Sequence, residues 1–125
     1  ATTLVELLDL FPTLAELAGL EAPANLQGKS LVPVIQDPQT DLGDVAISMF
    51  RRKGAYGYSM RTPRYRYTEW VSPDGKVVYR DLYDLKKDPD ETVNIGKAPE
   101  NHELMESMAA TLRANSTGLE RLQLR

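Results

Sequence analysis

The sequence predicts an α+β fold, in which a four-stranded antiparallel sheet packs against a long C-terminal helix and an N-terminal helix precedes it. Two strand-like runs, 55–62 and 65–71, alternate apolar and polar side chains and are joined by a Thr-Pro-Arg turn. Apolar residues recur at helical spacing near both ends of the chain. The short connections between successive strand-like runs favour antiparallel pairing.

The first element is expected to be a helix over about residues 9–18, where leucines recur at helical spacing. Thr3 followed by Glu6 fits a capping box for an earlier turn. Pro12 lacks an N–H, and a helix tolerates it in the first turn, where that donor would have no partner. The start of this helix is therefore placed near residue 9.

Residues 19–44 are rich in Gly, Pro, Asn, Gln and Asp, which is typical of a connecting segment. The sequence thus predicts a boundary after this segment. Residues 1–44 would form a helix and linker, and residues 45–125 would form a sheet-plus-helix subdomain. A length of 125 residues suits one compact domain or one subdomain of a larger protein.

Four strand-like runs follow, separated by turns that contain Pro, Gly or Asp. The runs cover residues 45–50, 55–62, 65–71 and 76–85. A final helix is expected over about residues 100–122, with one apolar face against the sheet. Four tyrosines of the two central runs are expected to lie in the core between sheet and helix: Tyr56, Tyr58, Tyr65 and Tyr67.

Composition indicates a globular chain, with 42% hydrophobic and 26% charged residues. A net charge of −3 excludes a general nucleic-acid binder, which would carry a clear basic excess. Six basic residues nevertheless fall within sixteen positions without an acid among them: Arg51, Arg52, Lys53, Arg61, Arg64 and Arg66. This basic run indicates an anionic ligand or an acidic partner surface, or else a solvated face of the sheet.

The residues that commonly carry catalysis are scarce. The chain has no cysteine, which excludes disulfides, zinc–thiolate sites and thiol nucleophiles. The sole histidine, His102, lies near the start of the last helix and is expected to have no catalytic role. The acids around residues 81–91 lack an EF-hand or zinc pattern, so no metal site is expected. Four polar residues are expected to fix the turn after the last strand: Asp84, Asp88, Glu91 and Asn94.

Three segments, in order, resemble the C-terminal third of the sulfatase family. Residues 4–35 are similar to its "D-L-x-P-T-L" helix, "A-G" stop and "x-G-x-S-L-x-P-x-L" stretch. Residues 57–70 (GYSMRTPRYRYTEW) resemble a hairpin, and residues 81–95 (DLYDLKKDPDETVNI) resemble "E-L-Y-D-L-x-x-D-P-x-E-x-x-N-L". Iduronate-2-sulfatases show the strongest resemblance, because they share the first helix and the "G-Y-S-[IM]-R-T-x-x-Y-R-Y-T-x-W" hairpin.

The resemblance also suggests candidate substrate-binding residues. Iduronate-2-sulfatases carry "S-Q-[YF]-P-R" before the hairpin, and residues 48–52 (SMFRR) stand at that place. Arg52 matches the motif's arginine, whereas Met49 and Arg51 depart from it, which leaves the exact substrate open. Arg52 is expected to reach a uronate carboxylate or a second sulfate. Arg61 is the second candidate, and an acid at a domain interface is its alternative partner.

The resemblance to sulfatases implies an N-terminal α/β catalytic domain that holds calcium and a formylglycine made from a "[CS]-x-P-S-R" motif. This sequence lacks that motif, so the chain alone is expected to be inactive while it shapes the substrate pocket of the whole enzyme. The implied partners are a sulfated sugar and the catalytic domain, with neither nucleic acid nor membrane. The implied location is periplasmic, secreted or lysosomal.

Two other functions remain open from the residues. The chain could be a stand-alone carbohydrate- or anion-binding module that uses its arginine- and tyrosine-rich sheet. It could also belong to a related alkaline-phosphatase-superfamily hydrolase, such as a phosphonate monoester hydrolase or a phosphodiesterase.

An isolated subdomain should expose the apolar side of residues 4–18, which predicts self-association or an altered position of that segment. Arg66 and Trp70 share a strand face and could stack, which would be a structural contact.

Overall fold

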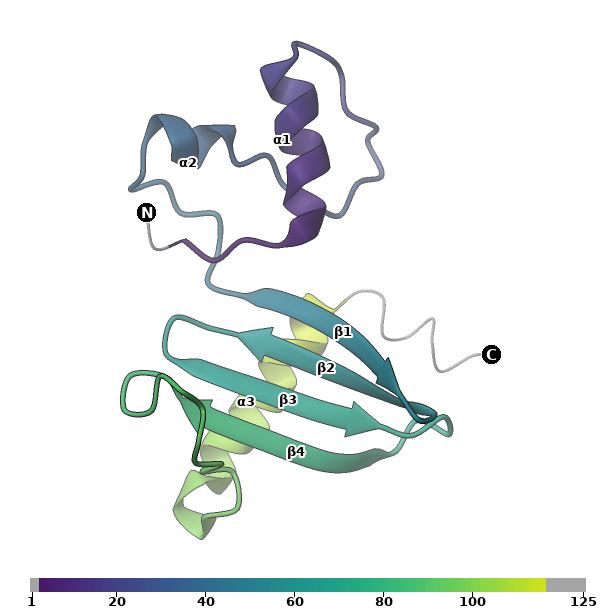
Figure 1. Ribbon diagram of the computed structural model, residues 1–125, viewed down its shortest axis with the longest axis vertical. Helices are drawn as coiled ribbons and strands as arrows, with labels where there is room; N and C mark the ends of the chain where they lie inside the picture. The colour runs from purple at the N-terminus through teal and green to yellow at the C-terminus, as the bar shows by residue number, and fades with distance from the viewer. Residues whose placement is uncertain (1–2, 117–125) are drawn as a thin grey trace. The chain divides into compact units, whose positions relative to one another are not determined.

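The computed structural model describes residues 3–116 of the 125-residue chain. The chain divides into two compact units, Ala1–Ala46 and Ile47–Arg125. The first unit is helical and the second is a sheet with a helix on one face, as Figure 1 shows.

The first unit contains a 3₁₀ turn, η1 (Leu7–Asp9), followed by α1 (Leu10–Leu17) and the short α2 (Val32–Gln36). The structure confirms the helix predicted over residues 9–18. The sequence did not indicate α2, because a helix of five residues is too short to show a helical period. Pro33, at its second position, also favoured the interpretation of this segment as a loop.

The capping box of this unit lies three residues later than the sequence suggested. The 3₁₀ turn begins at Leu7, so Glu6 rather than Thr3 is the N-cap residue. The backbone N–H of Glu6 donates to Oδ2 of Asp9 at 2.8 Å. The prediction of a Thr3–Glu6 box was therefore wrong, because Glu6 is the first residue of the motif and Asp9 is its acid.

The segment after α1 is fixed to the start of the helix by two buried side chains. Asp9 accepts a hydrogen bond from the backbone N–H of Lys29 at 2.8 Å. The hydroxyl of Thr13 accepts one from the N–H of Leu31 at 2.9 Å. Gly28 immediately precedes this contact, and a Cβ added there would overlap the carbonyl oxygen of Leu8. Glycine is therefore required by the close approach of two backbones.

We expect Gly28→Ala to destabilise the first unit by about 2 kcal/mol, because the new methyl group forces the two backbone segments apart. Hydrogen exchange should show faster exchange at the amides of Lys29 and Leu31 than in the unsubstituted chain. Gly19→Ala serves as a control, since a Cβ there meets no atom within 4 Å and the change adds only the cost of its positive φ of 68°. Equal protection of both amides in Gly28→Ala and the parent chain would show that the close approach is not required.

The second unit is built on the predicted four-stranded antiparallel sheet, with strand order β1-β2-β3-β4. The strands are β1 (Ala46–Arg52), β2 (Ala55–Arg61), β3 (Tyr65–Val71) and β4 (Val77–Asp84). The first strand ends two residues later than predicted. A two-residue turn, Lys53–Gly54, follows it with φ values of 46° and 85°.

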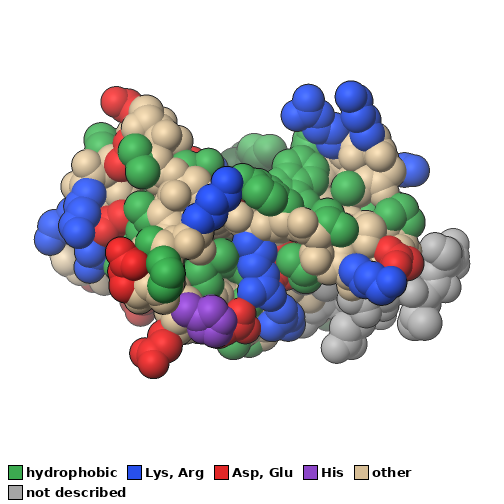
Figure 2. Space-filling model, turned by 90° about the horizontal axis from the view of Figure 1, so that it is seen from below, with side chains coloured by type: hydrophobic (Ala, Val, Ile, Leu, Met, Phe, Trp, Pro, Cys, Tyr) green, Lys and Arg blue, Asp and Glu red, His purple; other side chains and the backbone are tan. Residues whose placement is uncertain are grey.

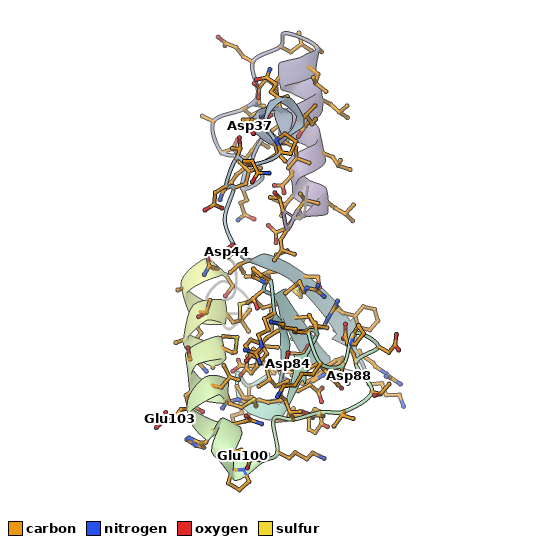
Figure 3. All side chains as sticks on the ribbon, turned by 90° about the vertical axis from the view of Figure 1, so that its left-hand side faces the viewer. Asp37, Asp44, Asp84, Asp88, Glu100 and Glu103 are labelled. Atoms are coloured by element: carbon orange, nitrogen blue, oxygen red, sulfur yellow. The ribbon has the colours of Figure 1, made fainter. Side chains whose placement is uncertain are left out.

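The C-terminal helix covers one face of this sheet. A 3₁₀ turn, η2 (Pro99–Asn101), leads into α3 (His102–Asn115), which Figures 1 and 3 show along the back of the sheet. The core between them is closed by four fully buried side chains: Tyr67, Met60, Leu82 and Leu112. The prediction of a helix over residues 100–122 is confirmed as far as residue 115, and residues 117–122 lie outside the described part.

The opposite face of the sheet, which we call the outer face, has no helix over it within residues 47–116. Met60, Tyr67 and Leu82 face α3, so alternate residues of each strand point to the outer face. The register arranges them in three cross-strand rows: Gly57–Trp70–Tyr79, Ser59–Thr68–Asp81 and Arg61–Arg66–Tyr83.

Candidate functional site

The two candidate arginines lie at opposite ends of the sheet. Arg52 is the last residue of β1 and Arg61 is the last residue of β2. The six residue steps along β2 from Ala55 to Arg61 correspond to roughly 20 Å of extended strand. A single sulfate or uronate group therefore cannot contact both guanidinium groups.

Both arginines nevertheless point to the outer face. Positive φ at both residues of the Lys53–Gly54 turn is typical of a type I′ hairpin, which sets Arg52 opposite the first residue of β2. Arg51 is then opposite Tyr56, and its guanidinium lies 5.6 Å from the centroid of the Tyr56 ring, as this register requires. Alternation places Arg52 and Phe50 on the other side of β1, which is the outer face.

The basic run of the sequence separates into two groups in the structure. Arg51, Arg52 and Lys53 are exposed at the β1–β2 turn, and no described Asp or Glu forms an ion pair with them. Figure 2 shows Lys and Arg side chains projecting together at the side of the molecule where Figure 1 places this turn. The turn therefore carries a local positive field that anions would enter.

The second basic group lies at the far end of β2 and β3, where acids neutralise most of it. Arg64 and Arg66 pair with Asp84 and Glu91 at 2.8 and 2.9 Å, respectively. Arg61 stands directly opposite Arg66, and its buried Nε has no hydrogen-bond partner among the described residues. Like charges opposite each other are unfavourable, and Arg61 is the arginine of this group that has no ion pair with a described acid.

Arg66 does not stack on Trp70, although the two residues share a strand face. The Nε of Arg66 lies beside Glu91 in an ion pair that lacks hydrogen-bond geometry. Trp70 is four residues further along β3, roughly 13 Å away. Its ring instead lies over Gly57, its cross-strand neighbour.

The Trp70 ring lies flat on Gly57. A Cβ placed on Gly57 would be 3.1, 3.1 and 3.2 Å from three consecutive atoms of the six-membered ring, Cη2, Cζ3 and Cε3. An edge-on ring would bring the middle atom much closer than its two neighbours, so the ring face must be directed at the glycine. The opposite face of the indole is therefore directed away from the sheet.

A buried ionic cluster lies on the helix-facing side. Glu69 is 4% exposed and accepts a 2.6 Å hydrogen bond from the Tyr67 hydroxyl. Arg80 and Arg113 approach the same carboxylate at 3.4 and 3.3 Å, and Arg80 also binds Glu106 at 2.7 Å. Burial, together with the hydrogen bond to Glu69, raises the pKa of Tyr67, so this tyrosine remains a donor. Every member has a partner, which makes the cluster a structural link between sheet and helix.

The acidic residues after β4 build the turn that the sequence predicted. Asp84 accepts the Lys86 N–H, and Asp88 accepts the Val93 N–H at 2.8 Å. Asn94 accepts the Leu82 N–H at 3.1 Å, on the free edge of β4. These bonds give all three side chains a structural role in the turn.

We expect the ion pair of Arg64 with Asp84 to make stability depend on acid pH. The guanidinium holds the pKa of Asp84 below its ordinary value, chiefly through a bidentate hydrogen bond. A depressed folded-state pKa contributes stability above the unfolded value of 3.8, and this stability is lost as the pH falls through the folded-state pKa. Thermal unfolding between pH 7 and 3 should show a steeper acid decline for the parent chain than for Asp84→Asn. Equal declines would contradict this assignment.

Among residues 3–116, no group of three His, Cys, Asp or Glu side chains is placed to hold a metal ion. Figure 3 shows Glu100 and Glu103 at the start of α3 and Asp88 on the loop at the other side of the sheet. His102 is exposed as the first residue of α3. Within the same residues, no helix is long and apolar enough to span a membrane.

Sequence reasoning missed two features of this unit. The ionic cluster joins Glu69 to Arg113, residues far apart in the chain, and only the packing of α3 brings them together. The packing of the Trp70 ring on Gly57 had a signal in the sequence, because a glycine within a strand often marks a close approach by another group. Gly57 and Trp70 fall on the same face once the turn at Thr62–Arg64 fixes the register.

Comparisons with known proteins agree with this architecture. Residues 1–117 match the family described as "N-sulphoglucosamine sulphohydrolase, C-terminal". A Delta 4,5-hexuronate-2-O-sulfatase from Bacteroides thetaiotaomicron is 36% identical over 84% of this chain and 22% of its own length. Arylsulfatase K from Rattus norvegicus is 35% identical over 90% of this chain and 21% of its own length.

A solved structure of a 2-O GAG sulfatase superposes on 90% of this chain and 24% of its own chain, with a TM-score of 0.71 and 31% identity. The chain thus spans about a fifth of the length of the curated relatives it matches, 22% and 21% of the two named above. The family match covers nearly all of the sequence, including both compact units. The chain belongs to the family of sulfatase C-terminal domains.

Proposed function

We propose that this chain is the C-terminal part of a sulfuric ester hydrolase that acts on 2-O-sulfated, uronate-containing sugars. The observation that carries the proposal is the family match over residues 1–117, together with relatives whose names specify 2-O-sulfate. The match favours a sulfatase over a free-standing binding module and over a phosphonate or phosphodiester hydrolase. An exported location, periplasmic, secreted or lysosomal, forms part of the same proposal.

The reactive centre of this enzyme would lie on polypeptide outside these 125 residues. The sequence contains no cysteine and no Ser-x-Pro-Ser-Arg motif from which a formylglycine could form. The described residues offer no set of ligands for calcium. The residues present therefore do not fit either group, and both would belong to a catalytic domain formed by the other four-fifths of such a protein.

With the reactive centre on the catalytic domain, the role of Arg52 is to contact an anionic group of the substrate. It is exposed, it lies in the acid-free β1–β2 turn, and it points to the outer face. A guanidinium can bind a uronate carboxylate or a sulfate through two parallel hydrogen bonds. Arg61 is the second candidate, and its unpartnered Nε supports contact with an anion. The spacing of the two arginines requires that they contact different groups.

The first unit supplies a surface for the catalytic domain. The apolar face of α1 and the turn before it is uncovered, with Leu7 87% and Leu14 64% exposed and Phe11 exposed between them. A continuous apolar surface of this kind is typical of a protein interface. Residues 1–44 would thus complete a layer of the catalytic domain, and the 125-residue chain alone would self-associate through this face. A strictly monomeric chain in light scattering, up to high concentration, would contradict the self-association.

The proposal is tested with the full-length protein that contains this chain. We expect it to release sulfate from a 2-O-sulfated unsaturated disaccharide, and we expect Arg52→Ala to lower kcat/KM about tenfold or more through one lost charge-assisted contact. Lys86→Ala, an exposed cation beyond β4, is the matched control and should leave kcat/KM unchanged. Turnover of a phosphonate or phosphodiester in preference to the sulfate ester would assign the protein to the alternative hydrolase.

A further inference from the structure

The outer face of the sheet carries a row of aromatic side chains next to the basic turn. The printed register sets Gly57, Trp70 and Tyr79 side by side across β2, β3 and β4. The type I′ turn extends this row to Phe50 on β1. Phe50 is 63% exposed and Tyr79 is 46% exposed. We call Phe50, Trp70 and Tyr79 the aromatic row.

We propose that the aromatic row is a binding platform for pyranose rings of a sulfated oligosaccharide. It deepens the proposed function, on which it rests, by assigning a substrate longer than one sugar. A pyranose ring presents an apolar face of C–H groups that stacks on an aromatic ring. The Trp70 indole lies flat on Gly57 with its second face directed away from the sheet, which is the orientation that such stacking needs.

Charge around the row suits an anionic glycan. Arg52 lies on the same face, two residues from Phe50, so its Cα is roughly 7 Å along the strand from the row. Arg61 lies on this face four residues beyond Gly57, roughly 13 Å in the other direction. Sugars stacked on the aromatic row would lie between these two arginines, which no single anion can bridge.

The described acids of the outer face lie at its β4 edge. Asp81 accepts a 2.7 Å hydrogen bond from the Asn94 side-chain amide, and Glu91 pairs with Arg66. Both acids come from β4 and the loop that follows it. On β2 and β3, the positions next to the aromatic row present hydroxyls instead, with Thr68 donating to Ser59 at 3.1 Å.

The composition of this face distinguishes a glycan from a polypeptide partner. The uncovered face of α1 consists of aliphatic and phenyl side chains without a charge, which suits another protein surface. The outer face combines separate aromatic rings with hydroxyls and guanidinium groups. Carbohydrate sites need this mixture, because each sugar has apolar ring faces and polar edges.

Trp70 is the only tryptophan in the chain, so its fluorescence reports on the platform directly. We expect a sulfated heparin-derived tetrasaccharide to change Trp70 emission in a saturable way, and an unsulfated tetrasaccharide to do so far more weakly. Phe50→Ala and Tyr79→Ala should each weaken binding about threefold, as expected for one lost aromatic contact. Gly57→Ala should also weaken binding, because its Cβ displaces the ring. Val93→Ala, an exposed apolar residue outside the row, should change nothing.

Three results would overturn the platform. Binding measured by calorimetry without any change in Trp70 emission would place the glycan elsewhere. Absence of any binding would show that the row is not a glycan platform. An emission change that depends on protein concentration and not on glycan concentration would show that a second copy of the chain occupies the face. Circular dichroism of each variant confirms that the fold is retained.

Kinetics of the full-length protein separate this proposal from the proposed function. We expect Phe50→Ala and Tyr79→Ala to lower kcat/KM for the sulfated tetrasaccharide about threefold while leaving that for a small aryl sulfate unchanged. Equal losses on both substrates would contradict an extended platform. If the parent protein hydrolyses neither substrate, the proposed function fails, and the fluorescence titration alone decides whether the platform binds a glycan.

Discussion

Glu69→Ala is expected to destabilise the sheet-and-helix unit by about 3 kcal/mol, because it removes the carboxylate at the centre of a buried cluster. The Tyr67 hydroxyl would lose its acceptor inside the core, and Arg80 and Arg113 would lose their common partner. Chemical denaturation monitored by far-UV circular dichroism measures the change.

Two further variants identify the cause of that loss. Glu69→Gln keeps an oxygen acceptor for Tyr67 but removes the charge, so it should cost less than Glu69→Ala. Glu106→Ala removes the exposed carboxylate at the edge of the same network, and its effect should be much smaller. An effect of Glu106→Ala as large as that of Glu69→Ala would show that the surface pair, and not the buried carboxylate, holds α3 on the sheet.

Leu112→Ala is expected to cost about 3 kcal/mol, because it leaves a cavity in the centre of the sheet–helix core. Leu112 is fully buried on α3. The matched variant Leu112→Met preserves most of the volume and should cost less than about 1.5 kcal/mol. Both values come from thermal or chemical unfolding of the whole chain, and a neutral Leu112→Ala would show that α3 does not close the core.

The sheet could be predicted from sequence because each strand carries an independent local signal. Residues 55–71 alternate in polarity on both sides of a proline-containing turn, and both alternation and turn chemistry specify the same register. The N-terminal details were less accessible. Glu6 and Asp9 are three residues apart, and from sequence either could be the acid that completes a capping box. Only the position of the first turn shows that Glu6 begins the box and Asp9 completes it.

The candidate site was partly accessible from sequence. Resemblance to a motif singled out Arg52, and the structure adds that it shares the outer face with Arg61 but lies at the opposite end of the sheet. The basic residues are close in the sequence and therefore suggested a single patch. In the structure, the length of β2 separates those at the β1–β2 turn from those at the β2–β3 turn. The pairing of Arg64 and Arg66 with acids depends on the loop after β4, and no local pattern in β3 indicates it.

The most direct test of this account compares the 125-residue chain with the full-length protein in an aryl sulfate assay. We propose that this polypeptide contributes binding surface while sulfur–oxygen cleavage occurs on residues outside it. We expect sulfate release by the full-length protein and none by the purified chain at matched concentration. Turnover by the chain itself, persisting through repeated purification and absent from a mock preparation, would contradict the account.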